Sequence, residues 1–192
     1  MKVEQFVMAY GAEQDRLRAI LPENFTSLRP VLRINAEIYG GNLNEAYVEF
    51  NTAVESGGKR GWLNIAHWND FKCESDGKTF EFSSPFLQMK FSMTGIEGGC
   101  PAEKDNDGCF FLGESCILRP AEKIAVNKTF YDCEFKWKFT DNDAHGVSIG
   151  KTLPAIPTEA KTQYEKLEFT AQNAAAIKCE QVLGAYCVKF QR

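Results

Sequence analysis

Two side chains in apolar, strand-like segments carry groups that bind anions or exchange protons. Arg33 interrupts the apolar sequence VLRIN, where a guanidinium could bind a carboxylate through two parallel hydrogen bonds or lie as a half-buried charge on a strand face. His67 lies within WLNIAHW, where an imidazole could act as a base or a ligand, although in such a place it is more often a hydrogen-bonded core or rim residue. We predict that Arg33 and His67 contribute to substrate binding.

Metal and nucleophile motifs are absent from the sequence. The acidic run DNDG at 105–108 lacks the further oxygen ligands of a calcium loop, and no Gly-x-Ser-x-Gly nucleophile motif occurs. The cysteines are odd in number, irregularly spaced and without a Cys-x-x-Cys pair, so we expect reduced thiols and no zinc site. They are Cys73, Cys100, Cys109, Cys116, Cys133, Cys179 and Cys187. The sequence therefore predicts no metal and no cofactor.

The composition predicts one globular domain over residues 1–192, because 192 residues with 44% hydrophobic content can bury a sizeable core. The net charge of −4 argues against nucleic acid and anionic membranes as partners. No run approaches the roughly 20 apolar residues that span a bilayer, and Lys2 is not followed by the apolar stretch of a signal peptide. We therefore expect a cytoplasmic protein.

Hydrophobic periodicity predicts a β-rich chain with one or two short helices. The segment Glu13–Leu21 repeats its apolar residues at helical spacing and ends at Pro22. The segment 158–181 is compatible with either helix or strand, with strand favoured after it. Alternating or apolar runs predict strands at Val3–Tyr10, Val31–Tyr39, Glu45–Val54, Trp62–Trp68, Thr79–Phe82, Leu87–Thr94, Cys109–Leu118 and Thr129–Thr140. Polar residues 69–78 are expected to form a loop.

The order strand, short helix, Leu21-Pro22-Glu23 turn, strand resembles the acetoacetate decarboxylase family. There the helix has the form D-x-x-x-L-R-x-x-L-P-E; this chain reads DRLRAILPE from Asp15, two residues shorter before the turn. The similarity runs at low density through most of the chain and is strongest over Val3–Trp68. It implies an α+β, β-rich fold: a closed, curved barrel with a central cavity and one or two short helices.

The same resemblance identifies two further candidate residues. The family decarboxylates β-keto acids through a Schiff base on a lysine, whose pKa is lowered by apolar surroundings and a neighbouring cation. Here the paired lysines of the family motif fall on Pro85 and Phe86, or on Phe86 and Leu87, so the nucleophile is missing. Lys90 is the nearest substitute, unless it is an ordinary outward lysine. Glu45, in Asn-Glu-Ala before an alternating strand, stands where the family has its active-site carboxylate, or is a solvated residue at a strand start.

Three functions follow from these observations. The first is an acetoacetate-decarboxylase-like protein that binds a small keto or carboxylic acid in its barrel cavity without Schiff-base catalysis, or that uses Glu45 as an acid or base. The second is an active decarboxylase or lyase with Lys90 as nucleophile. The third is a non-enzymatic carrier of an apolar small molecule. Because family members assemble, we also expect that the chain can form a homo-oligomer.

Overall fold

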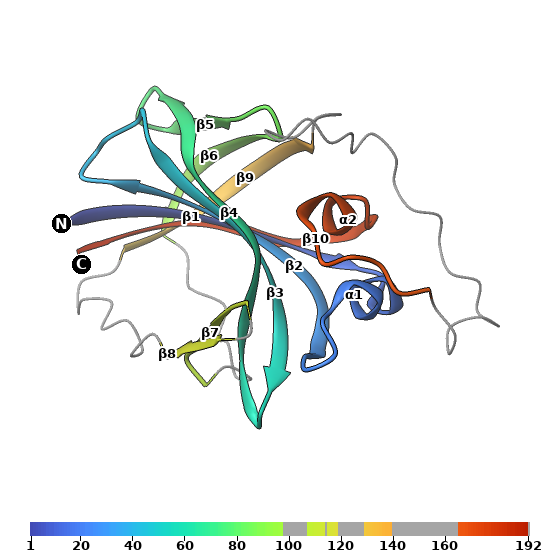
Figure 1. Ribbon diagram of the computed structural model, residues 1–192. Coiled ribbons are helices and arrows are strands. Elements are labelled where there is room, and N and C mark those ends of the chain that lie inside the picture. The colour runs from blue at the N-terminus through green and yellow to red at the C-terminus, as the bar shows by residue number, and fades with distance from the viewer. Residues whose placement is uncertain (98–106, 114, 119–128, 140–164, 192) are drawn as a thin grey trace.

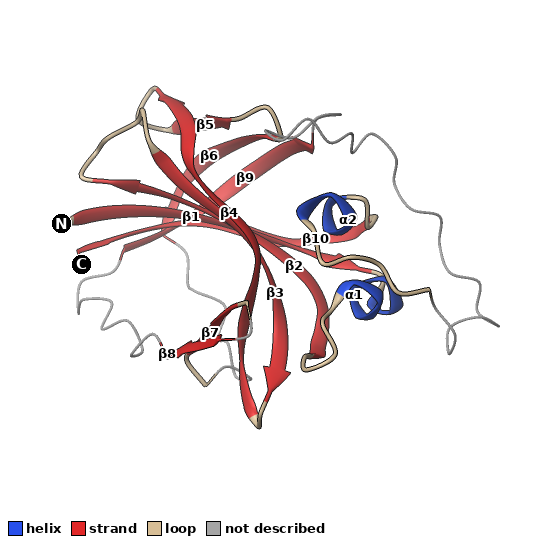
Figure 2. Ribbon diagram, in the orientation of Figure 1, coloured by secondary structure: helices blue, strands red, loops and turns tan. Residues whose placement is uncertain are grey.

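The computed structural model describes residues 1–97, 107–113, 115–118, 129–139 and 165–191 (Figure 1). Strands make up most of this part of the chain, and two short helices accompany them (Figure 2). In chain order the elements are β1 (Lys2–Ala12), α1 (Gln14–Ile20), β2 (Thr26–Tyr39), β3 (Ala46–Ser56), β4 (Lys59–Ser75), β5 (Thr79–Ser83), β6 (Leu87–Glu97), β7 (Cys109–Leu112), β8 (Ser115–Leu118), β9 (Thr129–Phe139), α2 (Ala171–Ala175) and β10 (Cys179–Gln191).

Eight strands close into one antiparallel barrel. Their order is β3-β2-β1-β10-β9-β6-β5-β4, and β4 pairs with β3 to complete the ring. The first and last strands lie side by side in the middle of this sheet (Figure 1), with Phe6 opposite Cys187. The predicted closed, curved β-barrel is confirmed, and closure leaves these eight strands without an open sheet edge at the seam.

Alternation along each strand fills the barrel with apolar side chains. On β1 the even-numbered residues Phe6, Met8 and Tyr10 point inward and are no more than 1% exposed. The Phe6 ring centroid lies 4.5 Å from that of Phe80, and the Tyr10 ring on β1 stacks on that of Trp137 on β9 at 5.6 Å. Each such aromatic pair adds about 0.5–1.5 kcal/mol beyond the area it buries, so this core stabilises the ring of strands.

The two helices lie together near one end of the barrel strands (Figure 2). α1 ends at the residue before Leu21-Pro22 and buries Leu17 and Ile20 against the barrel core. α2 begins after Thr170, whose hydroxyl oxygen accepts the Asn173 amide at 3.2 Å. Within the described part of the chain, neither helix has the length and hydrophobicity to cross a bilayer.

Three predicted elements differ from the structure. β4 continues to Ser75 rather than ending before a loop at 69–78, because Phe71 and Cys73 keep the inward alternation while Lys72 between them faces outward. The single strand predicted at Cys109–Leu118 is instead the β7–β8 hairpin, which turns at Gly113 with φ +62°. Of the ambiguous segment 158–181, residues 158–164 lie outside the described residues, 165–170 form no regular element, and α2 and β10 follow.

The β7–β8 hairpin attaches to the barrel through one close approach. β7 runs parallel to β4, with Gly61 opposite Cys109. A Cβ atom at Gly61 would lie 2.0 Å from the Cys109 carbonyl oxygen, so only glycine permits this pairing. Beside it, the Arg60 guanidinium bonds to the Asp107 carboxylate at 2.7 Å and lowers the pKa of that carboxyl to about 2.

Candidate functional site

A block of polar side chains lies on the outer face of β1 to β4, opposite the barrel core. The strand register arranges them in three rows. Five of them are buried although polar, at 5% exposure or less: Asn35, Glu37, Glu49, Asn51 and Asn64. The rows run Gln5–Glu37–Tyr47, then Asn35–Glu49–His67, then Arg33–Asn51–Asn64. We call these nine residues the polar face.

Each of the two glutamates on the polar face is held by neutral donors. The Gln5 amide donates to Glu37 at 2.6 Å, and the Tyr39 hydroxyl donates to the other Glu37 oxygen. Asn35 and Tyr47 donate to the two oxygens of Glu49, both at 2.7 Å. Burying a carboxylate is costly unless its oxygens are hydrogen-bonded, so these four donors explain how the two carboxylates are accommodated.

Two arginines of β2 lie over one indole ring at the border of the polar face. The guanidinium carbon of Arg33 lies 4.5 Å from the Trp62 ring centroid, and that of Arg29 lies 5.4 Å from it. The Arg33 Nε donates to the Asn35 carbonyl at 2.7 Å, which couples this cation to the hydrogen bonds of Glu49. Two guanidinium groups on one aromatic ring form a place where an anionic group gains from both charges.

At the β4 end of the polar face, Asn64 and His67 reach a surface hollow. The hollow has a volume of about 450 Å³. Besides Asn64 and His67 it is lined by Ile65, Ala66, Trp68, Leu112, Gly113, Phe169, Ala171 and Gln172. The His67 Nδ1 lies 3.0 Å from the Asn64 carbonyl oxygen, and its ring packs at 6.1 Å from that of Tyr47. This hollow therefore brings open space next to the buried polar groups.

Two of the four residues predicted from the sequence, Arg33 and His67, lie on the polar face. Glu45 does not: it is exposed, in the turn before β3. Lys90 does not either, because its amine points outward from β6 and pairs with Glu81 at 2.6 Å, both side chains being about half exposed. The enclosed, desolvated amine that a Lys90 nucleophile requires is therefore not found, and the second sequence hypothesis loses its structural basis.

Of the candidate positions of the family's paired lysines, Pro85 is exposed, and Phe86 and Leu87 belong to the apolar core. Phe86 and Leu87 are fully buried, and the Phe86 ring stacks on Trp68 at 4.9 Å. None of the lysines in the described ranges is buried; all are exposed except Lys189, which is half-buried and pairs with Glu4 at 3.2 Å. The described part of the chain thus offers no lysine amine enclosed in apolar surroundings.

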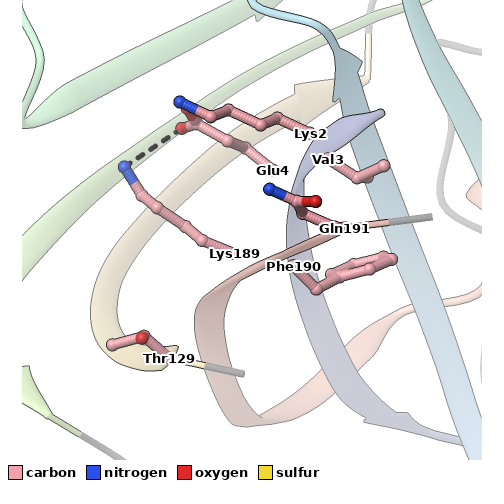
Figure 3. A pocket seen from close by; sticks show the side chains of 7 residues that line it. All are labelled: Lys2, Val3, Glu4, Thr129, Lys189, Phe190 and Gln191. Atoms are coloured by element: carbon pink, nitrogen blue, oxygen red, sulfur yellow. Dashed lines mark ion pairs between the residues drawn. The ribbon is translucent and has the colours of Figure 1, made fainter. Parts of the chain in front are cut away.

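Other hollows lie outside the barrel. The one in Figure 3 has a volume of about 600 Å³ and lies where β1, β9 and β10 meet; the Lys189 and Glu4 side chains reach toward one another in it. A second, of about 430 Å³, lies over the ladder of β5, β6 and β9 and includes Lys90. Both are lined by exposed or half-exposed ion pairs, which contribute little and are screened by salt.

Sequence reasoning missed the buried carboxylates Glu37 and Glu49 and the three asparagines. Their strands alternate apolar and polar residues, a pattern that is typical of a sheet with one solvated face. The signal available was asparagine itself, a poor strand former, which recurs at positions 35, 51 and 64 in otherwise strand-prone segments. A residue with low strand propensity inside a strand often serves a hydrogen-bonding role.

Comparison with known proteins identifies the architecture. No protein-family model matches the chain, and no curated protein matches it in sequence. Among solved structures it is similar to acetoacetate decarboxylase from Legionella pneumophila subsp. pneumophila str. Philadelphia 1, with a TM-score of 0.59 and 11% identity over 99% of this chain and 83% of that one.

Two further structures are similar. An acetoacetate decarboxylase-like enzyme from Sphingomonas wittichii RW1 has a TM-score of 0.53 and 10% identity over 98% of this chain and 88% of that one. The enduracididine biosynthesis enzyme MppR, complexed with pyruvate, has a TM-score of 0.51 and 10% identity over 98% and 84%. The chain therefore has the acetoacetate-decarboxylase-like fold; identities this low show the fold alone.

Proposed function

We propose that this protein binds a small keto or carboxylic acid at the border of its polar face and forms no Schiff base with it. The observation that carries the proposal is the pair of guanidinium groups, Arg29 and Arg33, over the Trp62 ring beside two buried, hydrogen-bonded glutamates. The barrel interior, lined by apolar side chains, gives a carboxylate no such partner among the described residues.

We expect Arg33 to be the main residue that binds the acid. Its Nε is held by Asn35 at 2.7 Å and its plane by Trp62, so little side-chain freedom remains to be lost on binding. The carboxylate of the ligand would bind at this guanidinium group. A protein of the same fold, MppR, has been solved with pyruvate, a small keto acid, which agrees with a ligand of this class.

The lysines in the described part of the chain support the proposed absence of imine chemistry. An amine that attacks a ketone must be neutral, and its pKa falls only in apolar surroundings or beside another cation. Lys90 has instead a carboxylate partner and open water. The residues at the candidate positions of the family motif carry no amine in either register; they are Pro85, Phe86 and Leu87.

Calorimetric titration of the full chain with pyruvate tests the proposal. Loss of one charge-assisted hydrogen bond of about 1.5–3 kcal/mol weakens binding by roughly 10- to 150-fold, and this is the effect expected for Arg33→Gln. The control Lys138→Gln removes the same charge from an exposed position on β9 and should bind as the wild type does. Equal affinity of Arg33→Gln and wild type, with both folded, would refute Arg33 as the acid-binding residue.

A trapping experiment tests the second half of the proposal. Incubation with acetoacetate and borohydride should leave the mass of the protein unchanged, and peptide mapping covers all lysines, including those outside the described residues. A covalent adduct on any lysine contradicts the proposal. Native mass spectrometry of the purified protein tests the carrier alternative: a co-purified apolar molecule that pyruvate does not displace would favour a carrier over an acid-binding protein.

A further inference from the structure

The hydrogen bonds around Asn64 determine which way its amide points. The Asn64 Nδ2 donates to the Asn51 carbonyl oxygen at 3.1 Å and to the backbone carbonyl of Ala66 at 3.2 Å. A flipped amide would place an oxygen against both acceptors and lose both bonds. Asn64 is only 5% exposed, so water does not compensate such a loss. The Asn64 Oδ1 therefore faces His67.

This orientation determines the tautomer of His67. Its Nδ1 lies 3.0 Å from the Asn64 Oδ1, and an oxygen acceptor requires a proton on the nitrogen that faces it. In the neutral ring the single proton then belongs to Nδ1, and Nε2 keeps its lone pair. The hydrogen bonds given above place no described residue on Nε2. The ring is exposed on β4, where it lines the 450 Å³ hollow.

Apart from His67 the lining of the hollow is uncharged and mostly apolar, and Asn64 and Gln172 are its other polar side chains. Its walls are formed by Trp68, Leu112 and Phe169, together with smaller residues, and Leu112 is 41% exposed. Among its lining residues His67 is the single titratable group. A volume of this size is within the range of small-molecule sites, in which a mostly apolar lining with few polar groups sets the orientation of the ligand. An acid would gain no counter-charge here, so a neutral ligand fits better.

We propose that this hollow binds a neutral small molecule that has an apolar body and one hydroxyl group, and that the His67 Nε2 accepts the hydrogen bond from that hydroxyl. Asn64 is the positioning residue, because it holds the proton on Nδ1. This inference goes beyond the proposed acid-binding function, since neither Arg29 nor Arg33 lines the hollow.

The tautomer is tested directly by nitrogen NMR of the imidazole in the intact chain, at a pH where His67 is neutral. We expect a protonated Nδ1 and an unprotonated Nε2. In Asn64→Asp, whose oxygen still accepts, the assignment should persist. In Asn64→Leu, which has no acceptor, it should shift toward the other tautomer. A protonated Nε2 in the wild type overturns the inference.

Ligand binding is tested with 4-methylphenol, and toluene serves as the same body without the hydroxyl. One neutral hydrogen bond is worth about fivefold in affinity, so the phenol should bind about fivefold tighter and shift the Nε2 resonance. His67→Phe should remove this difference, and Leu112→Asp should weaken binding of both probes. Equal binding of the two probes by the wild type, an unmoved Nε2 resonance, or unchanged binding by Leu112→Asp overturns the proposal.

Arg33→Gln separates this proposal from the acid-binding one. That variant should bind 4-methylphenol as the wild type does, whatever its affinity for pyruvate. Loss of phenol binding in folded Arg33→Gln would place the phenol at the arginines and contradict the assignment to the hollow.

Discussion

Asn35 connects the cationic and the anionic parts of the polar face, so its replacement tests the network most sharply. Its carbonyl accepts from the Arg33 Nε and its amide donates to Glu49, both at 2.7 Å, and the residue is 2% exposed. Asn35→Ala removes both bonds and leaves Glu49 with Tyr47 alone. A bond to a buried charge is worth about 1.5–3 kcal/mol, and water partly replaces the bond to half-buried Arg33. We therefore expect a loss of about 2–4 kcal/mol in the free energy of unfolding.

Asn35→Asp keeps the shape but changes the charge. It retains an acceptor for Arg33 and places a second carboxyl about 3 Å from Glu49, where two like charges cannot both ionise. The pair must hold a proton in the folded state that it loses on unfolding at neutral pH. Because the folded state then binds more protons, stability falls as pH rises. The variant should be close to wild type near pH 4, where the shared proton is bound in both states, and clearly less stable at pH 7.

Urea denaturation followed by tryptophan fluorescence measures both variants. Gln88→Ala, at an exposed position on β6, is the control and should stay within about 0.5 kcal/mol of wild type. An Asn35→Ala protein within about 1 kcal/mol of wild type, or an Asn35→Asp protein whose stability relative to wild type does not depend on pH, would show that the polar face is not a connected buried network.

Three further predictions concern the rest of the barrel. Gly61→Ala forces Cys109, and with it β7, away from β4 and should cost roughly 1–3 kcal/mol. Gly11→Ala meets its nearest atom at 3.7 Å and should be better tolerated; equal urea midpoints for the two variants would contradict this. Tyr10→Phe removes a buried hydroxyl that has no hydrogen-bond partner among the described residues. It should leave the unfolding free energy unchanged or raised, so a loss above about 1 kcal/mol would reveal a partner. Burial raises the pKa of the Cys73 thiol to about 12, so iodoacetamide at pH 8 should label it only after unfolding, as peptide mapping would show.

Local patterns predicted the elements whose formation depends on nearby residues. The opening strand, α1 and β2 follow from alternation, helical spacing and Pro22, all of which act over a few residues. The attachment of β7 does not, since it depends on a parallel pairing between β4 and a segment almost fifty residues later. A glycine at position 61 reads as a turn residue in the sequence, and only the approach of Cys109 gives it its role.

The candidate site was predictable to the extent that chemistry shows in single residues. Arg33 and His67 stand out in the sequence because a charged or titratable side chain is unusual in an apolar, strand-like run. Glu37 and Glu49 do not stand out, because the alternation of apolar and polar residues predicts that the strand has a polar face. It does not predict whether that face is exposed to solvent or buried. Glu45 and Lys90 were chosen by their place in a resembling pattern, and at 11% identity to a structure of that fold such a place does not determine exposure.

The most direct test of the central claim, that an acid binds at the arginines without condensing with a lysine, is carbon NMR of pyruvate labelled at its ketone carbon in the presence of the protein. We expect that the bound molecule keeps a ketone resonance and that Arg33→Gln strongly reduces the bound signal at the same pyruvate concentration. An imine carbon resonance, or an undiminished bound signal in Arg33→Gln, would contradict it.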